Sequence, residues 1–283
     1  MLHLLYNPFA DGNKGEEDAV EAKRKLEETG REVALTDSTT VSLDEFCKSL
    51  KEGDELALLG GDGTLNYFIN HVDVFPENPI YLYPSGTGND FLNDAKDTLE
   101  NKDNLYRIND CLKNLPHIDV NGKTYRFING IGFGIDGECC VVADEKKAAG
   151  ETEIDYSKIT ISLLMGPYKP RNAKVRVDGG EEVELKGAWM ACAMHGRCYG
   201  GGMNIAPNQK RNGDVLTLCV INKKGRLRTL MAFPGIFKGK HVGKKWAYMK
   251  EGKVIEVTFD EPCGLQIDGD VVKDVTYYKA YLG

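Results

Sequence analysis

The stretch Ala57–Asn70, ALLGGDGTLNYFIN, decides the fold of the first part of the chain. An apolar run ends in the glycine-rich turn GGDG, and a helical pattern follows directly. A buried strand that passes through a tight turn into a helix is the repeating unit of parallel α/β sheets. The turn also holds one acid, Asp62, among three glycines, so it is a candidate binding loop as well as a connection.

The first 115 residues repeat this alternation of strand and helix. Short apolar runs predict strands at residues 2–6, 32–36, 55–59 and 79–83. Apolar spacing predicts a helix over residues 16–30, and a second helix opens with Ser42 and Glu45 in the spacing of a capping box. Residues 1–115 therefore predict an α/β domain with a parallel sheet and right-handed crossovers.

From about residue 116 the apolar period changes to two. The pair Asn121-Gly122 and the run Asp178-Gly179-Gly180 lie between alternating segments, which indicates β-hairpins. We expect residues 116–274 to form a β-rich domain, mainly an antiparallel sandwich or barrel, interrupted by helices near 139–165 and 226–233. Residues 275–283 are a further strand, which could instead complete the first domain.

Composition narrows the class of protein. The chain has 283 residues and a formal net charge of −7, which argues against general nucleic-acid binding. It shows neither an apolar run long enough to span a membrane nor a signal-peptide pattern, so we expect a cytoplasmic protein. The eight cysteines are scattered without metal-ligand spacing, and we expect them to be reduced thiols.

One segment departs from the acidic balance of the chain. Residues 223–250 contain basic residues but no acid, with several apolar and aromatic residues interleaved. Such a composition suits a surface that contacts anionic lipid headgroups. A solvated basic face over a small core explains it equally well, and the sequence leaves both interpretations open.

Three glycine-containing loops follow the predicted strands of the first domain, at residues 7–15, 60–64 and 84–90. Loops that follow parallel strands emerge at one edge of the sheet, where ligands bind. Glycines let backbone N–H groups approach an anion, and the helix after each loop points its positive end there. The three loops therefore predict a polyphosphate site. Asp62 would repel phosphate, so we expect it to face a divalent cation.

Six motifs carry a resemblance that spans almost the whole chain: NPFADGNKG (7–15), GGDGTLNYFIN (60–70), PSGTGNDF (84–91), FINGIGFGIDGE (127–138), YGGGMNIAPN (199–208) and IDGD (267–270). Together they resemble the diacylglycerol kinase catalytic-domain family of lipid kinases, whose fold is shared with NAD kinases. The resemblance implies a three-layer, NAD kinase-like α/β domain with a parallel sheet, followed by a mainly antiparallel β-sandwich domain that binds the lipid.

The resemblance also implies ATP and magnesium as cofactors. The ATP-binding positions that match the family are Asn7, Thr36, Gly60, Gly61, Asp62, Gly63, Thr64, Asn66, Gly86, Thr87 and Gly88. Asp62 would organise the metal and the phosphates and so serve catalysis. Asn89 and Asp90, which end the GTGND motif, are at least as well explained as helix-capping residues.

Two acids of the second domain complete the implied site. Asp270 matches the catalytic base of a DGE motif but is one methylene shorter, and IDGD is alternatively a plain hairpin turn. Asp214 matches a position that holds a structural magnesium in the family. The usual Asp-Gly order is reversed here as Gly213-Asp214, which weakens the assignment of Asp214 as a metal ligand.

The predicted function is an ATP- and Mg-dependent lipid kinase that phosphorylates a diacylglycerol-like or sphingoid alcohol. A kinase of a soluble substrate, as in NAD kinases, and a nucleotide-binding protein with little turnover stay open as alternatives. The expected partners are the lipid substrate and an anionic membrane surface, contacted peripherally through residues 223–250. Nucleic acid is not an expected partner, and a homo-oligomer stays open.

Overall fold

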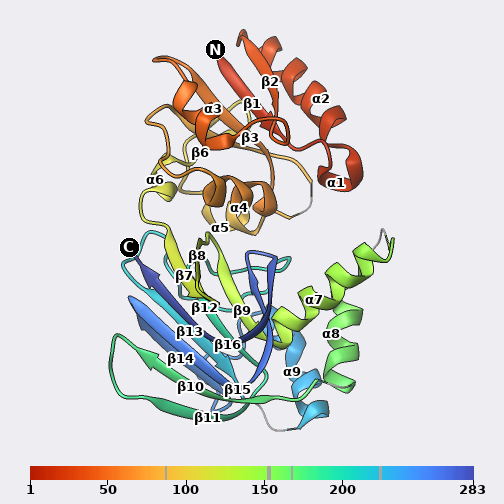
Figure 1. The fold of residues 1–283 in the computed structure, drawn as a ribbon, viewed down its shortest axis with the longest axis vertical. Coiled ribbons are helices and arrows are strands. Elements are labelled where there is room, and N and C mark those ends of the chain that lie inside the picture. The colour runs from red at the N-terminus through yellow and green to blue at the C-terminus, as the bar shows by residue number, and fades with distance from the viewer. Residues whose placement is uncertain (87, 152–153, 167, 223–224) are drawn as a thin grey trace. The chain divides into compact units, whose positions relative to one another are not determined.

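The structure is a computed structural model that describes residues 1–86, 88–151, 154–166, 168–222 and 225–283 (Figure 1). The chain divides into two compact units, Met1–Leu115 and Pro116–Gly283. In Figure 1 the first unit runs from red to yellow, and the second from yellow-green to blue.

The first unit is built on a six-stranded sheet in the order β2-β1-β3-β4-β6-β5. Its strands are β1 (Leu2–Tyr6), β2 (Val33–Asp37), β3 (Glu55–Gly60), β4 (Ile80–Pro84), β5 (Asn101–Lys102) and β6 (Leu105–Arg107). The first four are parallel, as predicted, while β6 runs antiparallel to β4, and β5 antiparallel to β6. The sheet is therefore mixed, with a short antiparallel edge that the apolar pattern did not reveal.

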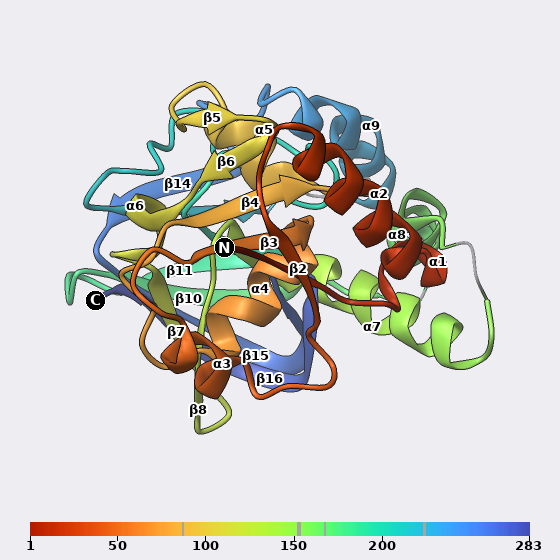
Figure 2. The ribbon, with the colours of Figure 1, turned by 90° about the horizontal axis from the view of Figure 1, so that it is seen from above.

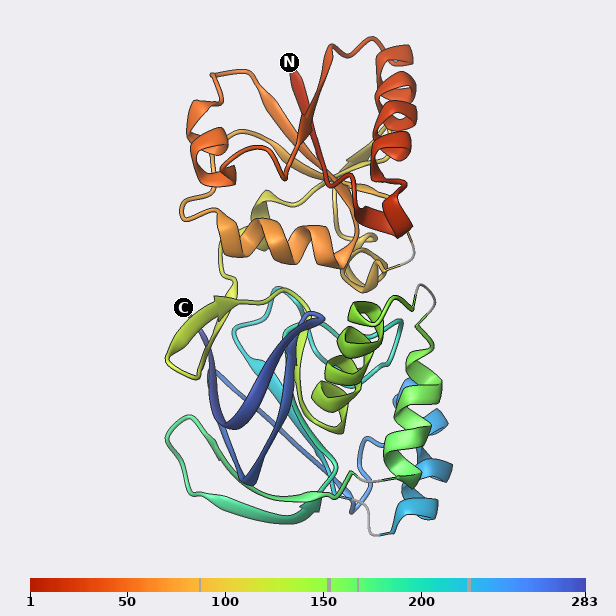
Figure 3. The same ribbon diagram turned by 45° about the vertical axis from the view of Figure 1, so that its right-hand side comes forward.

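Helices cover both faces of this sheet, which gives the predicted three layers (Figures 2 and 3). The helices of the unit are α1 (Ala10–Asn13), α2 (Gly15–Glu28), α3 (Leu43–Ser49), α4 (Asp62–His71), α5 (Asp90–Ala95) and α6 (Asn109–Leu112). Ala19, Ala22 and Leu26 of α2 are buried against the face formed by Leu2, Leu4 and other strand residues. The period of 3.6 in the sequence thus placed the buried stripe of α2 correctly.

Among the described residues of the second unit, ten strands form an antiparallel sheet. Its main path is β14-β13-β12-β9-β15-β16-β7-β8, and β10 joins β11 to β15. The strands are β7 (Pro116–Val120), β8 (Lys123–Arg126), β9 (Gly130–Gly134), β10 (Arg171–Val177), β11 (Val183–Ala188), β12 (Met190–Met194), β13 (Leu216–Ile221), β14 (Ala247–Gly252), β15 (Val254–Ile267) and β16 (Asp270–Leu282). Stacked Phe133 and Phe259, with ring centroids 4.1 Å apart, lie in its core.

Three helices accompany this sheet: α7 (Ile135–Ala148), α8 (Tyr156–Met165) and α9 (Arg226–Phe237). Helix α7 packs on β15, and α8 contacts both α7 and α9. The approach of α7 to β15 is very close, because a Cβ added at Gly137 would lie 2.1 Å from the carbonyl oxygen of Gly264. Among the described residues, no helix combines the length and apolar character needed to cross a bilayer.

Three predictions have clear outcomes. Asn121 and Gly122 adopt φ of 47° and 76° between β7 and β8, which confirms the predicted hairpin. The alternative that residues 275–283 complete the first domain is wrong. They belong to β16, which pairs with β15 and β7, and Val275, Tyr278 and Ala280 are buried in the core of the second unit. All eight cysteines are free thiols, as expected.

Candidate functional site

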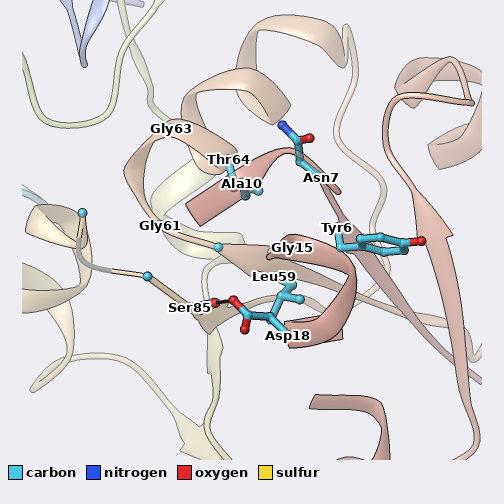
Figure 4. A pocket seen from close by; sticks show the side chains of 13 residues that line it. Tyr6, Asn7, Ala10, Gly15, Asp18, Leu59, Gly61, Gly63, Thr64 and Ser85 are labelled. Atoms are coloured by element: carbon cyan, nitrogen blue, oxygen red, sulfur yellow. Dashed lines mark hydrogen bonds between the residues drawn. The ribbon is translucent and has the colours of Figure 1, made fainter. Parts of the chain in front are cut away.

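A pocket of about 340 Å³ lies in the first unit where the loops after β1, β3 and β4 meet (Figure 4). It is lined by Tyr6, Asn7, Ala10, Gly15, Asp18, Leu59, Gly60, Gly61, Gly63, Thr64, Ser85, Gly86 and Gly88. Each of the three glycine-containing loops contributes to this lining. The topological prediction that they converge at one edge of the sheet is therefore confirmed.

Backbone contacts hold the second and third loops together. The N–H of Asp62 donates to the carbonyl of Gly88 at 2.7 Å, and the N–H of Ser85 donates to the carbonyl of Gly60 at 3.2 Å. A Cβ added at Gly61 would lie 2.0 Å from the carbonyl oxygen of Gly88. Only glycine fits at position 61, because the opposing atom belongs to the backbone and cannot rotate away.

In the first loop, too, a glycine lies directly against a backbone carbonyl. A Cβ added at Gly15, the first residue of α2, would lie 1.9 Å from the carbonyl oxygen of Asn7. The side-chain oxygen of Asn7 accepts a hydrogen bond from the N–H of Phe9 at 2.9 Å, which shapes the turn after β1. Asn7 therefore orders its own loop as well as lining the pocket.

Asp62 has a structural role that the sequence did not reveal. Its Oδ2 accepts the N–H of Asp90 at 2.7 Å, and its Oδ1 accepts the N–H of Phe91 at 2.9 Å. The carboxylate thereby caps the first turn of α5 from the neighbouring loop. Asn89 does not cap this helix with its side chain, whose amide donates instead to the carbonyl of Gly86 at 3.2 Å. Asp62 is not among the residues that line the pocket.

Among the described residues that line the pocket, Asp18 is the acid, and sequence reasoning missed it. Its Oδ2 accepts a hydrogen bond from the hydroxyl of Ser85 at 2.6 Å, as Figure 4 shows. Asp18 stands in the first turn of α2 with Glu16 and Glu17. Acids are common there because they complement the helix dipole, so the sequence carried no separate signal for a pocket residue.

The electrostatic character of the pocket comes from its backbone. Gly61, Gly63 and Thr64 lie at the start of α4, where the first N–H groups of a helix have no partner within the helix. Among the described residues, none of those that line the pocket is a lysine or an arginine. Such a site can bind phosphate oxygens through N–H groups, and the remaining negative charge requires a cation.

Three further predicted residues have different positions. Asn66 is 2% exposed and does not line the pocket. Its side-chain and main-chain oxygens accept hydrogen bonds from the side-chain amide of Asn70. Thr36 lies in β2 opposite Leu5 and does not line the pocket either. Thr87 lies outside the described residues. Contact of any of them with a nucleotide stays a prediction.

In the second unit, the IDGD motif forms the turn between β15 and β16, with φ of 47° at Asp268 and 102° at Gly269. The Asp268 carboxylate points inward and accepts the N–H groups of Ile128, Asn129 and Gly130 at 2.5, 2.9 and 2.9 Å. Asp270 begins β16 and is exposed. The motif is therefore a hairpin turn whose two acids have different surroundings.

Asp214 is exposed in the loop before β13. Among the residues that the structure describes, no group of three or more His, Cys, Asp or Glu side chains could hold a metal ion. A magnesium ion at Asp214 would therefore need backbone oxygens or waters as its other ligands, and the site stays a prediction.

Comparison with known proteins agrees with this architecture. Residues 1–120 match the family model of the diacylglycerol kinase catalytic domain, and residues 129–279 match that of the YegS C-terminal NAD kinase beta sandwich-like domain. The chain therefore carries a diacylglycerol kinase catalytic domain and a YegS C-terminal domain, and it is an enzyme of the lipid kinase class.

Several relatives resemble the chain over most of its length. The diacylglycerol kinase of Bacillus subtilis is 22% identical over 276 residues, covering 94% of this chain and 88% of the relative. The diacylglycerol kinase of Mycobacterium tuberculosis is 25% identical over 235 residues, covering 78% and 71%. The crystal structure of a diacylglycerol kinase from Bacillus anthracis, 20% identical, matches with a TM-score of 0.65 over 99% of this chain and 93% of that one. This structural likeness shows the shared fold.

The contact of Gly61 with Gly88 predicts a sharp difference between two glycines of one turn. Gly61→Ala should lower the free energy of unfolding by about 1–3 kcal/mol, because the new methyl group overlaps a backbone carbonyl. Gly63→Ala is the matched control, since a Cβ at Gly63 would meet no atom within 4 Å. Thermal and urea unfolding of both variants measure this, and equal stability of the two would contradict the close approach.

The capping role of Asp62 predicts an effect that needs neither nucleotide nor metal. Asp62→Ala should destabilise the protein by about 0.5–2 kcal/mol in metal-free buffer, because two N–H groups of α5 lose their acceptor. Amide hydrogen exchange at Asp90 and Phe91 should become faster. Asp97→Ala removes an exposed acid nearby and serves as the control. Wild-type stability and exchange in Asp62→Ala would show that the cap is absent.

Proposed function

We propose that the protein transfers the γ-phosphate of ATP, in the presence of magnesium, to the hydroxyl of a diacylglycerol-like or sphingoid lipid. The observation that carries this proposal is the pocket of the first unit, where three glycine-containing loops and the start of α4 meet. The match of the chain to a lipid kinase family supports phosphoryl transfer to a lipid alcohol.

The pocket supports a triphosphate as its ligand. Loops closed by Gly15 and Gly61 bring backbone groups to the rim without side chains in the way. We propose that these N–H groups bind phosphate oxygens through Asn7, Gly60, Gly61, Gly63, Thr64, Gly86 and Gly88. Tyr6 adds a phenol to the lining, and burial and the charges of Glu16 and Asp37 raise its pKa.

Magnesium fits the charge of this pocket. The lining residues described include an acid, Asp18, and no basic side chain, so a triphosphate needs a cation bound with it. Magnesium prefers oxygen ligands and keeps several waters, and when bound it would neutralise the phosphate oxygens. We propose that Asp62, whose carboxylate accepts the N–H groups of Asp90 and Phe91, acts on the cation through a bound water.

We propose Asp270 as the general base that accepts the proton of the lipid hydroxyl. Its carboxylate is exposed at the first residue of β16, as access to a second substrate requires. Phosphoryl transfer depends mainly on positioning and charge stabilisation, so the task of Asp270 is to hold the hydroxyl and take its proton. Asp268 is less suited to this task, since three backbone N–H groups already stabilise its charged form.

We also propose peripheral membrane contact through apolar side chains on the outer faces of α8 and α9. Most apolar residues of the 223–250 segment, including Ile236, Phe237 and Trp246, pack into a core with β12 and β13. Leu227 and Met231 on the outer face of α9 are 63% and 68% exposed, and Ile161 and Met165 of the neighbouring α8 are 46% and 55% exposed. The buried residues support the interpretation of the segment as a face over a small core, and the exposed apolar residues support the interpretation as a membrane-contacting surface.

The 223–250 segment also exposes basic residues. Arg228, Lys238, Lys240, Lys244 and Lys245 are exposed. Lys223 and Lys224, which belonged to the predicted segment, lie outside the described residues. A segment that exposes both apolar and basic side chains on an otherwise acidic chain suits contact with an anionic bilayer.

Labelled-phosphate transfer from ATP and magnesium to a panel of alcohols tests the proposed activity. We expect transfer to diacylglycerol or sphingosine in mixed micelles, and none to NAD. Asp270→Asn should lower kcat by about 10²–10⁴, the usual contribution of a general base, while calorimetry shows unchanged ATP binding. Asp274→Asn makes the same change at another exposed acid of β16 and should keep wild-type kcat.

Two results would contradict this assignment. Transfer to NAD without transfer to any lipid would favour a soluble substrate. Wild-type kcat in Asp270→Asn would remove the proposed base while leaving the kinase activity intact.

Sedimentation with vesicles tests the membrane surface. Leu227→Ser with Met231→Ser should weaken binding to phosphatidylglycerol vesicles at all salt concentrations. Lys238→Glu with Lys240→Glu should weaken it chiefly at low salt, since each basic residue near the surface contributes about 1 kcal/mol. Lys113→Glu, an exposed position of the first unit, is the control. Unchanged sedimentation of both double variants would exclude α9 as the docking surface.

A further inference from the structure

A chain of hydrogen bonds in the second unit ends at the turn that carries Asp270. Gln266 of β15 is 3% exposed and its side chain bridges two elements. Its Oε1 accepts the N–H of Gly269 at 2.8 Å, and its Nε2 donates to Oδ2 of Asp136 at 3.1 Å. Asp136 stands in the first turn of α7, so a single amide connects this helix to the Asp268–Asp270 turn.

The direction of every bond in this chain is fixed by chemistry. A backbone N–H can only donate, so the amide oxygen of Gln266 must face Gly269 and its NH₂ group must face Asp136. The carboxylate of Asp136 then accepts from Gln266 and from the hydroxyl of Tyr199. Tyr199 in turn lies 3.1 Å from the sulfur of Cys192. The network therefore has a single consistent arrangement while Asp136 is ionised.

The side chains of Asp136 and Gln266 fill the space beside the backbone of Gly132. A Cβ added at Gly132 would lie 1.6 Å from Oδ2 of Asp136 and 2.8 Å from Nε2 of Gln266. Gly132 lies opposite Gln266 in the pairing of β9 with β15. Any side chain at position 132 would displace the carboxylate of Asp136. The hydrogen bond between Asp136 and Gln266 therefore requires glycine at position 132.

The hydrogen bonds also keep Asp136 charged. Desolvation raises the pKa of Asp136 and the hydrogen bonds from Gln266 and Tyr199 oppose that rise, so that the resulting pKa is about 6. A carboxylate held in this way is a strong acceptor for the amide of Gln266. It fixes the amide rotamer, and the amide fixes the N–H of Gly269.

We infer that Gln266 and Asp136 are positioning residues that set the backbone of the turn and thereby the place of Asp270. This inference rests on the proposed function, in which Asp270 is the base. Asp268 holds one side of the turn through the N–H groups of residues 128–130, and Gln266 holds the other side at Gly269. A shift of the base by about 1 Å costs roughly a hundredfold in rate, so the second anchor matters for kcat.

A reversal of the hydrogen-bond polarity gives the sharpest test. Gln266→Glu places a second carboxylate against Asp136 and should lower kcat about 10- to 100-fold, with KM for ATP unchanged. Asp136→Asn combined with Gln266→Glu restores the chain. In that double variant the asparagine amide donates to one oxygen of the introduced carboxylate, while its other oxygen still accepts from Gly269. The double variant should recover kcat to within about threefold of wild type.

Amide hydrogen exchange supplies a readout that does not depend on activity. In Gln266→Met the N–H of Gly269 loses its acceptor and should exchange at least about tenfold faster. Lys273→Met is the matched control, since it makes a similar change at an exposed residue of the same hairpin. It should keep wild-type kcat and wild-type exchange at Gly269.

The outcomes separate this inference from the proposed function. A wild-type protein that phosphorylates no lipid overturns the proposed function and, with it, any catalytic purpose of the network. An active wild type whose Gln266→Met and Gln266→Glu variants keep both kcat and Gly269 protection overturns the network alone. Failure of the double variant to recover, with wild-type thermal stability, would also overturn it.

Discussion

The absence of a side chain at Gly61 is the constraint on which the pocket depends. Because a Cβ there would meet the carbonyl of Gly88 at 2.0 Å, the loops after β3 and β4 lie backbone against backbone. This contact lets the N–H of Asp62 reach Gly88 and lets its carboxylate reach the first turn of α5. Two loops that are far apart in sequence thus form one rim of the pocket, which the start of α4 also lines.

Glycines also allow close contacts in the second unit. Gly132 omits a side chain so that Asp136 and Gln266 can meet, and Gly137 omits one so that α7 can rest on the backbone of Gly264. In both units a glycine removes bulk at the point where a carboxylate must accept a distant hydrogen bond. These glycines are explained by their packing, and flexibility is not needed to account for them.

The sequence predicted what repeats locally and missed what depends on distant partners. Strands, hairpins and the convergence of the three loops follow from period, turn chemistry and topology, which are all local signals. The partner of Asp62 is a pair of N–H groups 28 and 29 residues away, and no local pattern announces it. Asp18 was hidden because a first-turn acid already has a sufficient explanation in the helix dipole. The place of residues 275–283 was left open because an alternating strand does not reveal which sheet it joins.

Because the side chain of Asp270 is short, the position of its carboxylate is set mainly by the backbone of the turn. A glutamate has one more rotatable bond than an aspartate, so it can adjust its carboxylate after the backbone is set, at a greater cost in rotamer entropy. An aspartate has less reach and less freedom, and its carboxylate follows the backbone closely. The turn that carries Asp270 is correspondingly held from both sides, by three N–H groups on Asp268 and by Gln266 on Gly269. The proposed base has little adjustment of its own, so its role in phosphoryl transfer would require such a fixed turn, because rate depends steeply on position.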